Sequence, residues 1–128
     1  MSYVVDAVPD GALAVISACT RLSLCSAEPA AGSGVAGVNA VRLVSYTVDA
    51  GDFTIQNASG DEAAAGGREV VIAAQSGGNA TASGTATHAV LDDGTDIRLS
   101  RALASNVNTT SGQPAGIGSF KYVIPDPS

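Results

Sequence analysis

The sequence predicts a mainly β protein, an antiparallel β-sandwich or jelly-roll-like domain of about seven strands with one short N-terminal helix. Three observations favour this class. Short apolar segments, several with period-two alternation, recur between turns rich in Gly, Asp and Asn. The 15 Gly and the few aromatics, three Tyr, two Phe and no Trp, suit thin β layers with many turns. The strands do not alternate with long helices, which disfavours a doubly wound α/β fold.

A length of 128 residues fits one domain, expected over residues 1–128. Residues 1–9 are predicted to form an extended N-terminal arm, a shape that can add a strand to a neighbouring subunit. The helix candidate covers residues 10–19, with Asp10 as N-cap and with Leu13 and Ile16 on one face. Because about ten residues make a marginal helix in isolation, we expect it to pack on a sheet.

Seven strands and their connections follow the helix. The strands are predicted at residues 21–25, 40–48, 53–57, 68–75, 83–91, 96–104 and 116–124. Tight turns are predicted at residues 49–52, 76–79 and 92–95, and longer loops at residues 26–39, 58–67 and 105–115. Binding residues concentrate on loops, so we expect the three longer loops to be the contact surfaces.

The charge of the chain argues against nucleic-acid and membrane partners. The net charge is −6, and the six Lys and Arg residues form no basic stripe of the kind that follows a phosphate backbone. An acidic surface also suits anionic lipids poorly, and no apolar run approaches the roughly 20 residues of a membrane helix. The N-terminus lacks the positive region of a secretion signal, so we expect synthesis in a cytoplasm.

The single histidine, His88, lies in the predicted strand 83–91. Strict alternation places Ala86, His88 and Val90 on one face of this strand. Nucleophilic catalysis would need a Ser or Cys and an orienting acid beside it, and no Ser stands in a Gly-X-Ser-X-Gly turn. We therefore expect a structural histidine, no catalytic residue and no enzyme. The alternative is a small hydrolase or ligand-binding module that uses His88 with Asp92 and Asp93.

The densest acidic cluster, Asp92, Asp93 and Asp96, has two interpretations. Carboxylates are ligands for calcium, but the EF-hand spacing and its final Glu are missing. Asp-Gly in a short connection is among the strongest hairpin-turn signals, which favours a turn. The glycines around Ser33 also lack the Lys-Ser/Thr of a phosphate-binding loop. The sequence thus predicts neither a metal nor a cofactor site.

The two cysteines, Cys19 and Cys25, have a spacing that matches no metal or redox motif. The simpler interpretation is two reduced, partly buried thiols. The alternative is a disulfide, within or between subunits, formed after the protein leaves the cell. A bridge within one subunit needs a sharp reversal of the chain between the two positions.

Several segments resemble a known group of proteins when read in order. They are residues 21–29, 52–54, 67–77, 83–88 and 124–127. This order, after an N-terminal helix, is similar to small virion structural proteins of tailed double-stranded DNA bacteriophages and prophages, and the similarity covers roughly residues 10–127. The short turn at residues 92–95 departs from the longer polar loop of that group. The shared motifs are structural, so the resemblance implies a role in the particle and no enzymatic residues.

The resemblance implies a virion protein, made in the host cytoplasm and assembled into the particle. We favour a capsid decoration or cement protein that stabilises the head by binding the assembled shell, with the major capsid protein as partner. The alternative is a neck, tail or fibre-anchoring component. Self-association as a homo-oligomer, such as a trimer at a symmetry point of the capsid, would bury edge strands.

Overall fold

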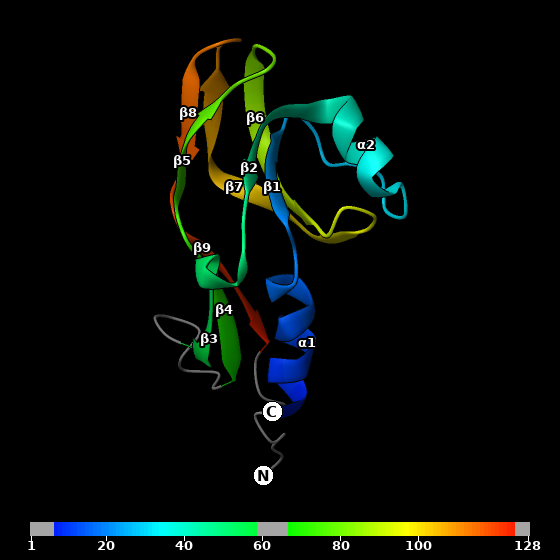
Figure 1. The fold of residues 1–128 in the computed structure, drawn as a ribbon, viewed down its shortest axis with the longest axis vertical. Coiled ribbons are helices and arrows are strands. Elements are labelled where there is room, and N and C mark those ends of the chain that lie inside the picture. Colours follow the sequence, from blue (N-terminus) through cyan, green and yellow to red (C-terminus); the bar gives the residue numbers. More distant parts are fainter. Residues whose placement is uncertain (1–6, 59–66, 125–128) are drawn as a thin grey trace.

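The computed structural model describes residues 7–58 and 67–124 (Figure 1). Two α-helices, one 3-10 turn and nine strands occur in this part of the chain. In chain order they are α1 (Ala7–Ser17), β1 (Arg21–Cys25), α2 (Gly34–Val41), β2 (Arg42–Thr47), η1 (Ala50–Asp52), β3 (Phe53–Asn57), β4 (Arg68–Ile72), β5 (Gln75–Asn79), β6 (Gly84–Asp92), β7 (Ile97–Thr109), β8 (Pro114–Ile117) and β9 (Phe120–Ile124).

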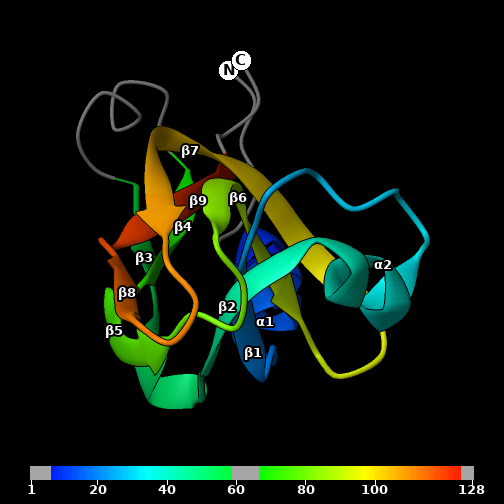
Figure 2. The same cartoon turned by 90° about the horizontal axis from the view of Figure 1, so that it is seen from above.

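The strands form antiparallel sheets, which confirms the predicted fold class. A four-stranded sheet has the order β2-β1-β6-β7, a three-stranded sheet has the order β3-β4-β9, and β5 pairs with β8 in a two-stranded ribbon. Figure 1 shows the four-stranded sheet in the upper part of the molecule and β3, β4 and α1 at its lower end. Figure 2 shows α2 and the β5-β8 ribbon on opposite sides of this sheet.

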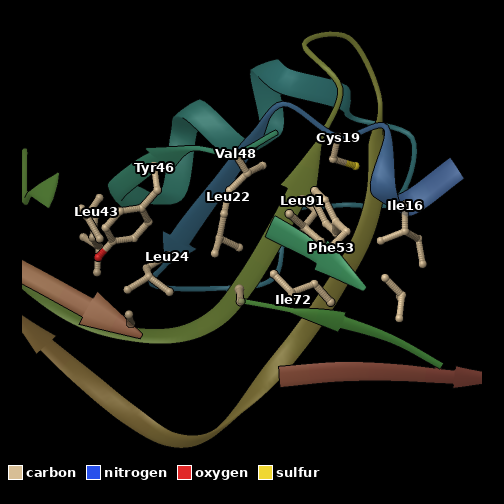
Figure 3. Close-up of a cluster of buried hydrophobic side chains, with 14 of the residues drawn as sticks. Ile16, Cys19, Leu22, Leu24, Leu43, Tyr46, Val48, Phe53, Ile72 and Leu91 are labelled. Atoms are coloured by element: carbon tan, nitrogen blue, oxygen red, sulfur yellow. The ribbon is translucent and has the colours of Figure 1, made fainter. Parts of the chain in front are cut away.

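The core is built on the alternating apolar residues of β1, the same pattern from which this strand was predicted. Leu22 and Leu24 point to one face, and each meets an apolar partner on both neighbouring strands. Leu22 lies opposite Tyr46 and Leu91, and Leu24 lies opposite Val44 and Ala89. Figure 3 shows this face packed against Phe53 and Ile72 of the second sheet and against Ile16 of α1. Burial of such side chains contributes roughly 1.5–3 kcal/mol each.

The first helix begins earlier than predicted. Residues 7–9 belong to α1 and not to an extended arm, and Asp10 lies in the first turn instead of capping it. Proline is tolerated in a first turn because its missing N–H has no intrahelical acceptor there, so Pro9 does not end the helix and is buried. Asp10 instead pairs with Arg68 of β4 at 2.7 Å. Residues 1–6 of the predicted arm lie outside the described residues.

The predicted turn at residues 76–79 is a strand, and the predicted strand at 116–124 is two. β5 owes its conformation to pairing with β8 and to a close approach by Tyr46. A Cβ at Gly78 would stand 2.8 Å from the Tyr46 ring, so glycine lets the ring lie against β5. The Tyr46 hydroxyl then donates to the Ala115 carbonyl of β8 at 2.6 Å.

The second helix, α2, was not predicted, because its segment reads as a Gly-rich loop followed by a strand. Tertiary packing overrides the weak helix propensity of its glycines. Val38 is fully buried and contacts Cys25 and Val90 on the outer face of the four-stranded sheet. The central strands β1 and β6 are therefore covered on both faces in this region.

Candidate interaction surface

His88 lies on the outer face of the four-stranded sheet, between Cys25 and Ala102 in register. Its Nδ1 is 2.9 Å from the Thr87 hydroxyl, which also contacts the Ser26 carbonyl at 3.1 Å. A carbonyl only accepts, so the hydroxyl donates to Ser26, and His88 Nδ1–H donates to the hydroxyl. A general base would instead accept the hydroxyl proton, so this hydrogen bond runs in the direction opposite to the one that activates a nucleophile. On the other side, Nε2 lies 3.7 Å from the Glu28 carboxylate.

The strict alternation predicted for this strand is wrong at one point. The β6-β7 register shifts between Ala86, opposite Val107, and His88, opposite Ala102. Residues 103–106 of β7 therefore form a bulge opposite Thr87 alone. At Thr87 the alternation of β6 is interrupted, so the side chains on either side of it no longer follow one continuous pattern. Ala86 joins the main core instead of sharing the face of His88.

The acidic cluster is a turn, as its Asp-Gly signal predicts. Gly94 has a φ of +96°, which glycine adopts without a steric penalty. Asp93 accepts from the backbone of Thr95 and Asp96 and pairs with Arg98. The two backbone hydrogen bonds and then the Arg98 side chain lower the pKa of Asp93 to about 2.

The Asp92 side chain contacts a different arginine from the one that Asp93 contacts, and it is fully buried. It pairs with Arg21 at 3.1 Å and accepts from the Gly94 backbone. The carboxylates of Asp92 and Asp93 thus have different protein partners, Arg21 for the first and Arg98 for the second. In residues 7–58 and 67–124, no three His, Cys, Asp or Glu side chains gather as a metal site requires.

Both thiols are free and buried. Burial raises the pKa of Cys19 to about 12 and that of Cys25 to about 11. Cys25 is the last residue of β1, and the four residue steps of this strand at about 3.3 Å each span roughly 13 Å. Cys19 precedes the strand and belongs to the main core, whereas Cys25 belongs to the separate cluster around Val38. A disulfide requires Cα atoms within about 7 Å, so a bridge within one subunit does not fit this fold.

The edge strands β7 and β9 line a shared groove of about 290 Å³, formed by residues 99–101 and 121–123. Within the described residues no backbone ladder joins them. The Arg101 guanidinium crosses to the Lys121 carbonyl, and the Lys121 ammonium pairs with the buried Glu69 carboxylate at 3.3 Å. The β7 bulge borders a second cavity of about 370 Å³ beside Phe120. Cations and bulges are features that protect strand edges from association.

The exposed side of α1 is different, because it carries no charge. Val8 and Val15 are 61% and 48% exposed, among the most exposed large apolar residues of the described chain. The remaining exposed positions of the helix are small, namely Ala7, Gly11, Ala12 and Ala14. We call these six residues the α1 face. An apolar helix face without cover is typical of a surface that another protein buries.

The predicted contact surfaces were loops, and the α1 face was missed. A signal for it is present in the sequence: residues 7–18 contain one charged residue, Asp10. A helix that is apolar on all sides needs cover on all sides. Of the three predicted loops, 26–39 contains six of the eight residues of α2, 105–115 contains the end of β7 and the start of β8, and 58–67 lies largely outside the described residues.

No protein-family model, curated protein or solved structure matches this chain. Among the described residues, neither helix has the length and apolar character needed to cross a bilayer.

Proposed function

We propose that the chain is a structural protein of a tailed-bacteriophage particle, and most specifically a decoration protein that binds the outside of the assembled capsid shell. The observation that carries the assembly role is the α1 face, which a domain of net charge −6 leaves apolar and uncharged. The phage assignment rests on the resemblance of residues 67–77 and 83–88 to small virion proteins.

The groups with catalytic potential support assembly over reaction, because each has a structural partner. Asp92 is held by Arg21, Asp93 closes the hairpin, and His88 donates toward Thr87. Burial keeps both thiols protonated at neutral pH, which removes their nucleophilic form. None of these groups lies on the α1 face.

A decoration protein acts by mass action. Binding to the assembled lattice, and not to free capsid subunits, stabilises the lattice by the free energy of that binding. The partner is then the major capsid protein, and the protein is located in the virion. A neck or tail component would use the same fold at a single place in the particle, so copy number separates the two roles.

The test is the number of copies in purified particles, measured from stained gels against the major capsid protein and by electron cryo-microscopy. Decoration predicts hundreds of copies, in fixed ratio to the capsid protein, and heads that resist heat less when the protein is missing. About a dozen copies would assign it to the neck or tail instead. Its absence from particles would overturn the virion role.

The same particles test the enzyme alternative. His88→Gln removes the imidazole and keeps a polar side chain of similar reach. Particles that carry this variant are expected to assemble and infect normally. Loss of infectivity with normal assembly would support a chemical role for His88 and count against a purely structural protein.

A further inference from the structure

The cavity that borders the β7 bulge has an apolar lining and a polar rim. Four partly buried side chains that pack against the main core form the apolar part, namely Leu103, Val107, Ile117 and Phe120. The rim is exposed and includes Arg101, Ser105 and Asn106. The cavity volume of about 370 Å³ lies within the roughly 300–1,000 Å³ typical of sites for small molecules. These features fit a small ligand with an apolar body.

The bulge and the small residues around it keep the cavity open. Residues 103–106 have no register partner on β6, so β7 departs from its ladder along one side of the cavity. The turn after β8 forms another side, and a Cβ added there at Gly118 would meet no atom within 4 Å. Ala102 and Ala104 also line the cavity and are too small to fill it. The described side chains thus leave this space open.

Arg101 supplies the charge of the cavity. It lies opposite Ala89 in register, and residues opposite each other in an antiparallel pair share a face. Because Ala89 belongs to the main core and also lines the cavity, the Arg101 side chain leaves β7 on the side of the cavity. Among the described residues of the lining, Arg101 is the only one that carries a charge. One cation beside an apolar interior suits a ligand with one negative charge and an apolar body.

The Arg101 guanidinium keeps donors for such a ligand. Its Nη1 donates to the Lys121 carbonyl, and within the described residues neither Nε nor Nη2 has an acceptor. These two nitrogens lie on one side of the planar group, where a carboxylate accepts two parallel hydrogen bonds. A phosphate monoester carries a charge of about −1.5 to −2, more than one arginine balances. The charge therefore favours a carboxylate over a phosphate.

We infer that this cavity binds an aliphatic monocarboxylate, with the carboxylate on Arg101 and the chain against Leu103, Ile117 and Phe120. If each non-hydrogen atom takes about the 30 Å³ that a water molecule occupies in the liquid, the cavity holds roughly a dozen such atoms. A straight-chain acid of the size of decanoate fills it. The site is separate from the α1 face, so the inference goes beyond the capsid-binding role.

The test is calorimetric titration of the isolated chain with hexanoate, octanoate, decanoate and dodecanoate, each below the concentration at which it forms micelles. We expect the affinity to rise about fourfold for each added methylene, because each one leaves water for the apolar lining. The rise should stop at about decanoate, since the end of a longer chain finds no further space in the cavity. Acetate, which has the head without the chain, should show no measurable binding.

Three protein variants test the head group. Arg101→Gln should weaken octanoate binding by about tenfold or more, and Arg101→Lys, which keeps the charge without the planar fork, should recover part of the loss. Ala40→Glu, at an exposed position of α2, lowers the net charge by the same amount as Arg101→Gln and should bind as the wild type does. Octan-1-ol, which has the chain without the charge, should bind the wild type about tenfold or more weakly than octanoate.

The location of binding is read from backbone amide resonances, which should shift at Ala102, Leu103 and Ile117 when decanoate is added. The inference is overturned if decanoate shows no saturable binding, if the affinity keeps rising at dodecanoate, or if the shifts leave these residues unchanged. Equal losses in Arg101→Gln and Ala40→Glu would also overturn it, because they would reflect net charge alone. Each of these results leaves the virion role standing, since the copy number in particles tests that role.

Discussion

The β7/β9 groove and the α1 face are both surfaces that the domain leaves uncovered, and they are built in opposite ways. Arg101 and Lys121 line the groove, and a bulge interrupts β7 beside it. The α1 face has neither charge nor irregularity, and its two valines are exposed. We expect the cations to oppose association along this open strand edge, and the lack of charge on the α1 face is consistent with the binding role proposed for that face.

The largest effect should come from contrasting the two sides of α1. Leu13→Ala empties a fully buried site and is expected to lower the free energy of unfolding by about 2–5 kcal/mol. Val15→Ala removes an exposed side chain and should change it by less than about 0.5 kcal/mol. Urea unfolding of both variants measures the difference. Similar losses would mean that Val15 is part of the core and not of an interface.

The next effect concerns the cation that holds the β9 edge. Lys121→Met removes a partner of the Glu69 carboxylate, whose side chain is 1% exposed. Because Lys121 is itself partly exposed, the expected loss is about 1–3 kcal/mol, below that of a fully buried pair. Thermal unfolding with Gln56→Ala as the companion variant compares the contributions of Lys121 and Gln56, two of the groups that contact Glu69.

A smaller, pH-dependent effect is expected in the hairpin that leads into β7. Hydrogen bonds from the backbone of Asp96 and Thr95 lower the folded-state pKa of Asp93 to about 2, below the ordinary aspartate value of about 3.9. The ionised carboxylate therefore stabilises the fold above about pH 4, and this contribution is lost as the pH falls through about 2. Asp93→Asn should be less stable than wild type at pH 7, and the two stabilities should converge in acid. A constant difference across this range would contradict the assignment.

The smallest effect on stability should come from the edge itself. Arg101 is exposed, so Arg101→Ser should change the free energy of unfolding by less than about 1 kcal/mol. Its protective role predicts a different readout, namely more aggregation on prolonged storage at high concentration. Light scattering against Ala40→Glu, which lowers the net charge by the same amount at an exposed position of α2, separates edge protection from a general effect of charge. Equal scattering by the Arg101 variant and the control would show that Arg101 does not protect the strand edge.

Local patterns predicted most strands of the four-stranded sheet, but they predicted neither its strand order nor the register shift between β6 and β7. The alternation of residues 21–25 and the Asp-Gly turn at residues 92–95 fix β1 and the β6-β7 hairpin. β5 and α2 were not predictable in this way. β5 depends on its pairing with β8 and on the Tyr46 ring beside Gly78, and α2 depends on the burial of Val38 against Cys25 and Val90.

The candidate surface was harder to find than the fold. The acids, the histidine and the thiols drew attention as reactive types, but their partners come from strands distant in sequence, as Arg21 does for Asp92. The α1 face has no reactive group at all. It becomes visible when burial shows which side of the helix the core covers and which side it leaves exposed.

The most direct test of the contrast measures binding of the purified protein to particles that lack it. We expect Val8→Glu with Val15→Glu to weaken this binding by about tenfold or more, because the variant places charge on the α1 face. Arg101→Ser, at the β7 edge, should bind as the wild type does. Unchanged binding of the α1 variant, with loss of binding in Arg101→Ser, would contradict the account.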